Sequence, residues 1–151
     1  MLQNILSDLY ERDLNKLKQE IEQYSDETDL WKTSGSMPNS AGNLCQHLCG
    51  NLRHFIGAVL GKSGYVRDRD SEFTREDVSR AALIGEIDAT LADVRSTLEG
   101  LSDDVLASDY PIDVFGKGPF KTDWFLIHLA THFNYHLGQL DYHRRLVGTH
   151  Q

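Results

Sequence analysis

The sequence predicts an all-α fold, an antiparallel four-helix bundle. Two observations carry this prediction. Apolar residues recur three and four positions apart in four long segments, and there is little sign of strands apart from one connection. At 151 residues the chain has the length of one ordinary domain, and it holds no internal repeat. We therefore expect a single domain over residues 1–151.

Four segments carry the apolar repeats, and we expect helices near residues 3–24, 40–61, 75–100 and 122–147. Asn39 or Ser40 is expected to cap the second helix, and Thr74 opens a sequence typical of a capping box before the third. The apolar face of the last helix is formed by Leu126, Leu129, Ala130, Phe133, Leu137, Leu140 and Val147.

Residues 105–120 differ from the helical segments around them. The sequence from Tyr110 to Phe115 is followed by Gly116-Lys117-Gly118, which is typical of a turn. We expect either a short hairpin or an extended arm before the last helix. The charged stretch from Arg67 to Asp70 is expected to be a loop.

Composition and charge exclude several classes of partner. The net charge is -8 and the pI is near 5.2, which opposes binding to phosphate backbones. No apolar run approaches the roughly 18 residues that a membrane helix needs. The first residues are polar and acidic in part, unlike a signal peptide. We expect a cytoplasmic protein with neither a nucleic acid nor a membrane as its partner.

Three of the seven histidines follow one another at four-residue steps in the last helix: His128, His132 and His136. Adjacent members are about 5–6 Å apart at Cβ, so two imidazoles can bind one ion, whereas the outer two are about 12 Å apart. On a helical wheel, His136 lies about 65° from the centre of the apolar face, His132 about 105° and His128 about 145°. His132 and His136 are therefore the predicted pair, and His128 turns toward solvent or toward the surroundings of the site.

A third ligand should come from a facing helix. His47 and His54 lie seven residues apart in the second helix and on the same side of it, and wheel geometry alone does not separate them. Cys45 falls about 160° around that helix from His47, which disfavours a mixed cysteine–histidine site. We expect Cys45 and Cys49 to be small core residues. The alternative to a metal site is that the histidines are surface residues or hydrogen-bonded core residues.

Two other motifs fail. Neither histidine pair in the last helix has Glu after its first His, so the metalloprotease helix with its general base is excluded. The sequence from Gly57 to Ser63 is one residue short of a phosphate-binding loop and stands at the end of a helix instead of the start.

Two polar residues are candidate catalytic residues. Asp13 lies near the centre of the first helix's apolar face, where an unpaired carboxylate is costly. It is expected to hydrogen-bond a ligand imidazole or an inner Arg or Tyr, unless the helix register leaves it at the rim. Asn51, one turn after His47, could line an open metal position, and capping or surface polarity is the alternative. Tyr135 and Trp31 are pocket walls or aromatic core residues.

The sequence IHLATHFNYHLGQL, residues 127–140, resembles the last-helix motif of the DinB/YfiT superfamily, H-x-x-x-H followed closely by Gly-Gln. The His47-Leu48 pair matches that family's first ligand, early in its second helix. The four segments match in order over nearly the whole chain, and the two motifs together are more specific than either alone. Leu137 departs from the Arg that many members carry, at a position that is not a ligand.

The resemblance implies a four-helix bundle, often a homodimer, with a nickel, zinc or similar divalent ion on His47, His132 and His136. It selects His47 over His54, and it leaves His54, His128 and Tyr135 as candidates for the surroundings of the metal or its pocket.

A site of three neutral imidazoles keeps a fourth position for water or substrate, which is typical of catalytic zinc sites. Such an ion lowers the pKa of bound water to about 7 or holds a thiol as its thiolate. Some relatives are thiol transferases, and one branch isomerises maleylpyruvate with a low-molecular-weight thiol. The resemblance therefore implies a metal-dependent thiol S-transferase, with such a thiol as cosubstrate, or a hydrolase, acting on a small-molecule substrate. The alternative is a non-catalytic, metal-binding dimeric bundle that acts in stress response or through partners.

Overall fold

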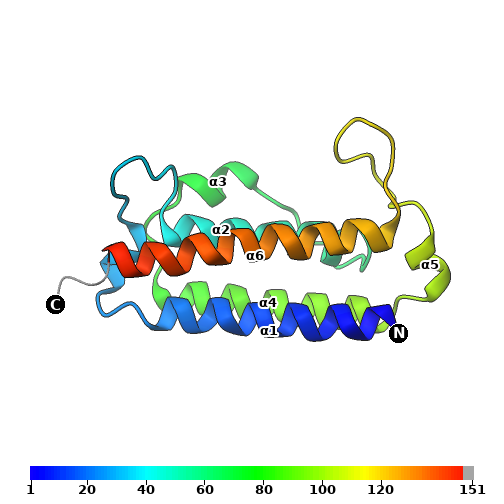
Figure 1. Ribbon diagram of the computed structural model, residues 1–151, viewed down its shortest axis with the longest axis horizontal. Coiled ribbons are helices and arrows are strands. Elements are labelled where there is room, and N and C mark those ends of the chain that lie inside the picture. The colour runs from blue at the N-terminus through cyan, green and yellow to red at the C-terminus, as the bar shows by residue number, and fades with distance from the viewer. Residues whose placement is uncertain (148–151) are drawn as a thin grey trace.

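Four long helices lie side by side in the computed structural model, which describes residues 1–147 (Figure 1). They are α1 (Leu2–Glu22), α2 (Ala41–Leu52), α4 (Arg80–Glu99) and α6 (Thr122–Val147). Within the described residues the chain forms helices and no strand, so the all-α class is confirmed. The bounds of the first and last helices lie within two residues of the predicted ones.

The bundle consists of two antiparallel pairs, α1 with α4 and α2 with α6 (Figure 1). The pairs also pack on each other, α1 against α6 and α2 against α4. The connection from α2 to α4 returns along the bundle, so these two helices run in the same direction (Figure 1). This connection contains the short helix α3 (Arg69–Thr74), which packs on α2.

The third predicted helix begins later than expected. Thr74 does not open a capping box, because it is the last residue of α3, which Asp68 caps by accepting from Ser71 N at 3.3 Å. Ser79 instead caps α4 by accepting from Ala82 N at 3.1 Å. Of the two predicted caps for α2, Ser40 is correct, since its Oγ accepts from Asn43 N at 3.2 Å. The charged loop predicted before the third helix thus contains a helix of its own.

The second predicted helix, residues 40–61, has two parts. It begins as the α-helix α2 and continues as a π-helical segment, η2 (Arg53–Ala58). In η2 the backbone hydrogen bonds reach five residues back, as in Val59 N to His54 O at 3.0 Å and Gly61 N to Ile56 O at 2.9 Å. Two further short helices, η1 (Glu27–Trp31) and α5 (Asp103–Ala107), were not predicted.

An extended arm connects α5 to α6, and it projects from one end of the bundle (Figure 1). Its base is closed by a single antiparallel bridge between Asp109 and Lys121, with Tyr110 N donating to Phe120 O at 2.7 Å. Gly116 and Gly118 turn the arm with positive φ angles of 71° and 91°. Of the two predicted alternatives, the extended arm is therefore the correct one.

The core lies between the four long helices. α1, α4 and α6 each bury one face in it, whereas every residue of α2 is buried. Within residues 1–147 no helix is both long enough and apolar enough to span a membrane. Tyr10 is fully buried in α1 and ties this helix to α6 by donating to Leu126 O at 2.6 Å. The apolar side chains at the centre of the bundle include Leu14, Leu17, Ile21, Leu48, Leu52, Ile87, Val94, Leu98, Phe125, Phe133 and Leu140.

Candidate metal centre

Three histidines converge between α2 and α6. His132 and His136 lie one turn apart on α6, and His47 of α2 faces both. One ring nitrogen from each can be chosen so that all three lie within 4.8 Å of one another. The Nε2 atoms of His47 and His132 are 3.3 Å apart, and the ring centroids of the three pairs are 4.6 to 5.3 Å apart. Within the described residues this is a group that could hold a metal ion.

The arrangement fits a tetrahedral ion. With metal–nitrogen bonds of 2.0–2.1 Å, two ligand nitrogens stand about 3.3 Å apart, which is the observed His47–His132 separation. Burial, followed by the neighbouring His136 and His47, lowers the pKa of His132 to about 4. Burial also lowers the pKa of His136. Both rings are therefore neutral at pH 7 and offer lone pairs, the state in which imidazole binds metals.

A carboxylate orients His47. The Nδ1 atom of His47 hydrogen-bonds Glu72 Oε1 at 3.1 Å, which directs Nε2 toward the other two histidines. Arg67 donates to both oxygens of Glu72, from Nε at 2.8 Å and from Nη2 at 3.0 Å. Burial raises the pKa of Glu72, but the hydrogen bonds from His47 and Arg67 outweigh this effect and the pKa is lowered. A carboxylate in this position commonly fixes the tautomer of a metal-binding histidine.

A glycine in α2 makes room for this carboxylate. A Cβ atom placed on Gly50 would lie 1.9 Å from Glu72 Oε2. The bare backbone at this position lets α3 approach α2 closely enough for Glu72 to reach His47. Sequence analysis missed both residues: Arg67 lies in the stretch interpreted as a charged loop, and Glu72 lies just after it, before the predicted third helix. The signal that could have revealed them is Gly50 in the middle of a predicted helix.

His136 is held by its own helix. Its Nδ1 atom and Gln139 Oε1 are 2.7 Å apart, so the Gln of the Gly-Gln motif orients the second ring of the pair. Tyr135 stands beside it with ring centroids 5.3 Å apart, but its side chain is 66% exposed and lines a neighbouring pocket. His132 Nδ1 is buried and has no hydrogen-bond partner among the described residues.

The three histidines open into a pocket of about 560 Å³. Asn51, one turn after His47, lines this pocket, as sequence analysis proposed. Arg67 and Arg69 provide its charge, and no Asp or Glu belongs to its lining in the part of the chain that the structure describes. The apolar walls are Phe55, Phe73, Val114, Phe115, Phe125 and Leu129. The extended arm thus reaches the site through Val114 and Phe115.

His128 and His54 stand apart from the three-histidine group. The ring of His128 lies among aromatic rings, with centroids 5.2 Å from Trp124 and 5.5 Å from Phe115, and it lines the pocket. His54 packs against Phe55 at 4.7 Å and does not line the pocket. Of the candidates for the surroundings of the metal, His128 is therefore a pocket wall.

Asp13 lies elsewhere in the bundle. It is buried, but its carboxylate accepts hydrogen bonds from Asn134 and from Arg12, the latter at 2.9 Å. It lines pockets between α1 and α6 that contain none of the three histidines. Of the expected partners, an Arg is present, although Arg12 is exposed and not an inner residue. The expected hydrogen bond to a ligand imidazole is wrong. The reason is that Asn134, from the side of α6 that faces α1, satisfies the carboxylate instead.

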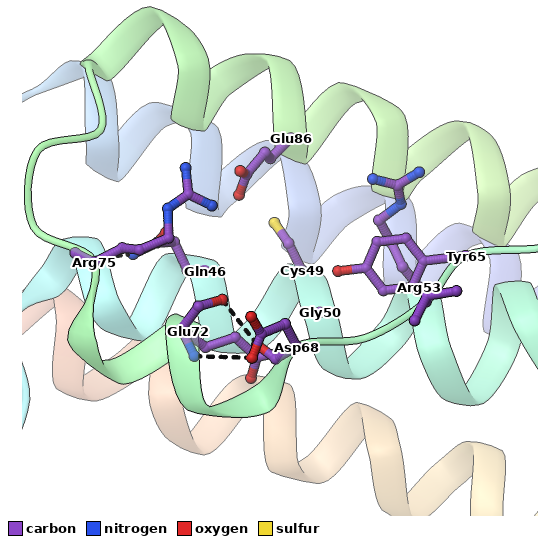
Figure 2. A pocket seen from close by; sticks show the side chains of 11 residues that line it. Gln46, Cys49, Gly50, Arg53, Tyr65, Asp68, Glu72, Arg75 and Glu86 are labelled. Carbon is purple, nitrogen blue, oxygen red and sulfur yellow. Dashed lines mark hydrogen bonds between the residues drawn. The ribbon is translucent and has the colours of Figure 1, made fainter.

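The two cysteines are buried and free, as expected for core residues. The hydrogen bond to Cys49, together with burial, raises the pKa of the Cys45 thiol. Cys49 borders a second pocket of about 380 Å³, whose lining includes Glu72 and none of the three histidines. Figure 2 shows that Glu86 of α4 and Cys49 of α2 point into this second pocket, between Arg75 and Arg53. Neither thiol belongs to the three-histidine group.

Fold and site together define an all-α bundle with a three-histidine group that could hold a metal ion. The chain matches, over residues 3–151, the model of the family described as "Protein of unknown function (DUF1572)", and it belongs to that family. It is also similar to a solved structure, "Crystal structure of the conserved protein of locus from Enterococcus faecalis". The two are 18% identical with a TM-score of 0.76 over 95% of each chain, which shows a shared fold. Among curated proteins there is no match.

Proposed function

We propose that this chain is a metal-dependent enzyme of the DinB/YfiT type, which carries out thiol transfer or hydrolysis on a small molecule. The observation that carries the proposal is the convergence of His47, His132 and His136 beside a pocket of about 560 Å³. Pockets for small ligands have volumes of about 300–1,000 Å³. A closed structural site would have neither the pocket nor a ligand set limited to three neutral imidazoles.

Nickel or zinc is the proposed metal, because imidazole nitrogen suits both ions. A divalent ion held by the three histidines would keep a fourth coordination position for water or a thiol. It would act there as a Lewis acid and make the bound water or thiol more acidic. In the transferase case a low-molecular-weight thiol is the cosubstrate.

The chain's own residues have separate tasks in this proposal. Glu72 holds the ring of His47, and Gln139 holds the ring of His136. Asn51 is the candidate polar group beside the reacting atoms, since its side chain lines the pocket next to His47. The aromatic walls exclude water from the apolar side of the pocket, which strengthens polar interactions inside it. Asp13 has no role here, because it lies outside this pocket.

We also propose that the chain forms a homodimer through α6. Five large apolar or aromatic side chains on this helix are 47 to 68% exposed: Trp124, Ile127, Tyr135, Tyr142 and Leu146. On a helical wheel they fall within about 100° of one another, with Thr131 and Gly138 between them. An exposed apolar stripe of this length is typical of a helix that packs against another helix.

The second candidate function is a non-catalytic, metal-binding dimer that acts in stress response or through partners. The exposed stripe on α6 favours it, whereas the pocket beside the histidines favours the enzyme. Conjugation of a test electrophile to a thiol, measured with the metal-loaded protein, separates the two.

Metal content tests the site itself. Protein purified without a histidine tag should bind one divalent ion per chain. His132→Ala should abolish binding, because this ring contributes the nitrogen nearest to that of His47. His128→Ala is the matched control, since it removes a histidine of the same helix that stands outside the group and should leave metal content unchanged. Equal loss in both variants would mean that a different pair of histidines holds the ion.

A further inference from the structure

The pocket beside the histidines has an aromatic wall. The rings of Phe55 and Phe125 are 5.4 Å apart, and His128 lies 5.5 Å from Phe115 and 5.8 Å from Phe125. All four rings line the pocket. A further flat ring in the pocket can make offset or edge-to-face contacts with these rings at similar centroid distances, and such contacts are favourable. The wall therefore suits a ligand with an aromatic body.

The charge of the pocket is positive, although the chain as a whole carries a net charge of -8. Two arginines belong to its lining, and no carboxylate does within the described residues. Arg67 is already paired, since it holds both oxygens of Glu72. Arg69 is exposed and lies over the ring of Phe73 at 5.7 Å. Among residues 1–147 it has no acidic partner, so its charge is available to a ligand.

A buried polar group in the same pocket also lacks a partner. Asn51 is 7% exposed, and its Oδ1 atom has no hydrogen-bond partner among the described residues. An unsatisfied buried carbonyl costs about 1–3 kcal/mol. A ligand that enters the pocket can remove this cost by donating a hydrogen bond. Asn51 is thus an independent sign that the pocket is built for an occupant.

We propose that this pocket binds a small aromatic anion, with its ring against Phe115 and Phe125 and its negative group on Arg69. The proposal rests on the function proposed above and names the class of its substrate. It follows from three features of one cavity: the aromatic wall, the unpaired guanidinium and the absence of any repelling carboxylate from the described lining. The three histidines of α2 and α6, which would hold the metal, then stand beside the bound molecule.

Three probes of related shape test the proposal on zinc-loaded protein. Benzenesulfonate carries both the ring and the charge, and a sulfonate is a poor metal ligand. Methyl phenyl sulfone keeps the ring without the charge, and methanesulfonate keeps the charge without the ring. Dissociation constants from NMR titration should be about tenfold lower for benzenesulfonate than for the neutral sulfone, since one charge-assisted hydrogen bond corresponds to about a factor of ten. They should also be about tenfold or more lower than for methanesulfonate, because burial of an aromatic side chain contributes about 1.5–3 kcal/mol.

Variants assign the two halves of the ligand. Arg69→Ala should weaken benzenesulfonate binding about tenfold and leave the neutral sulfone unchanged. Phe115→Ala should weaken both aromatic probes. Lys117→Ala is the matched control, because Lys117 is an exposed cation on the extended arm that carries Phe115 and does not line the pocket. This variant should bind benzenesulfonate and the sulfone as wild type does.

Zinc content, measured in every variant, separates this proposal from the one on which it rests. If wild-type protein binds neither zinc nor nickel, the proposed function fails and the substrate class fails with it. If zinc is bound but benzenesulfonate binds equally well to wild type and Arg69→Ala, the proposed anion site is overturned and the metal site stands. Equal affinity for benzenesulfonate and methanesulfonate would overturn the aromatic half.

Discussion

Replacing Glu72 with Gln tests how the bundle orients its candidate metal ligands. In the folded chain, Glu72 joins His47 to Arg67 through three hydrogen bonds of 2.8 to 3.1 Å. Gln is nearly the same size, so α3 and Gly50 can keep their close packing. It removes the negative charge that makes the His47 ring a better donor of its lone pair. The expected result is weaker metal binding in a chain that still folds.

The magnitude follows from the burial of the carboxylate. The side chains of Glu72 and Arg67 are 6% and 10% exposed, so water does little to replace the lost interaction. Loss of a group that orients a metal-binding histidine lowers metal affinity about 10- to 100-fold, which is about 1.4–2.8 kcal/mol. Removing one partner of a buried ion pair costs about 3–5 kcal/mol of stability. Gln keeps a carbonyl acceptor for Arg67, so we expect a smaller loss of stability than with Ala.

Competition with a coloured zinc chelator at pH 7 measures the affinity, and urea unfolding of the metal-free chain measures the stability. Glu86→Gln is the matched control, because Glu86 is a half-buried carboxylate that lines the second pocket (Figure 2) and not the pocket beside the histidines. It should bind zinc like wild type. Glu72→Gln protein that binds zinc within twofold of wild type would refute the idea that this carboxylate positions His47.

Three further predictions concern pH, assembly and chemistry. Burial lowers the pKa of His132 to about 4 and lowers the pKa of His136 and His143 from the ordinary 6.5. The free energy of unfolding of the metal-free protein should therefore have its full value above about pH 6.5 and fall by on the order of 1–2 kcal/mol by pH 5. Solvent at the half-buried rings keeps this loss small. A free energy of unfolding in urea that stays constant over this pH range would contradict the prediction. Light scattering should give twice 17.1 kDa, and Tyr142→Glu on the α6 stripe should give monomers; a wild-type monomer at all concentrations would exclude the dimer. Adding a small thiol to cobalt-loaded protein should produce sulfur-to-metal charge-transfer absorption that needs His136 and is insensitive to Cys45→Ala. If no thiol changes the spectrum and no hydrolysis is found, the metal is better explained as structural.

The parts of the fold that could be predicted are those set by local periodicity. A three-and-four spacing of apolar residues places one face of each long helix in the core whatever its neighbours are. The last helix therefore begins where the sequence indicated, at Thr122, and extends to Val147, the last residue that the structure describes. The wheel positions of His132 and His136 follow from the same geometry, and both rings belong to the three-histidine group whereas His128 does not. Contact between helices α2 and α6 then brings His47 to this pair.

The parts that could not be predicted depend on contacts between distant segments. Glu72 reaches His47 only because α3 folds back onto α2 at Gly50, and nothing in the charged sequence around it distinguishes this from a solvated loop. Asp13 is buried, which is one of the two positions that the sequence left open, and its partner, Asn134, lies 121 residues away. A wheel can identify the side of a helix on which a side chain lies, but the neighbour on that side is fixed by packing.

The choice between His47 and His54 shows why helix type matters as much as helix position. In a continuous α-helix these two side chains would lie on the same side, seven residues apart. At Arg53, however, the chain enters the π-helical segment η2, where each residue advances through a smaller angle than in an α-helix. His54 therefore lags behind the α-helical position, and Phe55 takes the place that faces the pocket, 5.4 Å from Phe125 on α6. Since packing selects the π turn, wheel arithmetic that assumes 100° per residue cannot separate the two histidines. The residue of η2 that lines the pocket beside the three histidines is therefore the aromatic Phe55 and not His54.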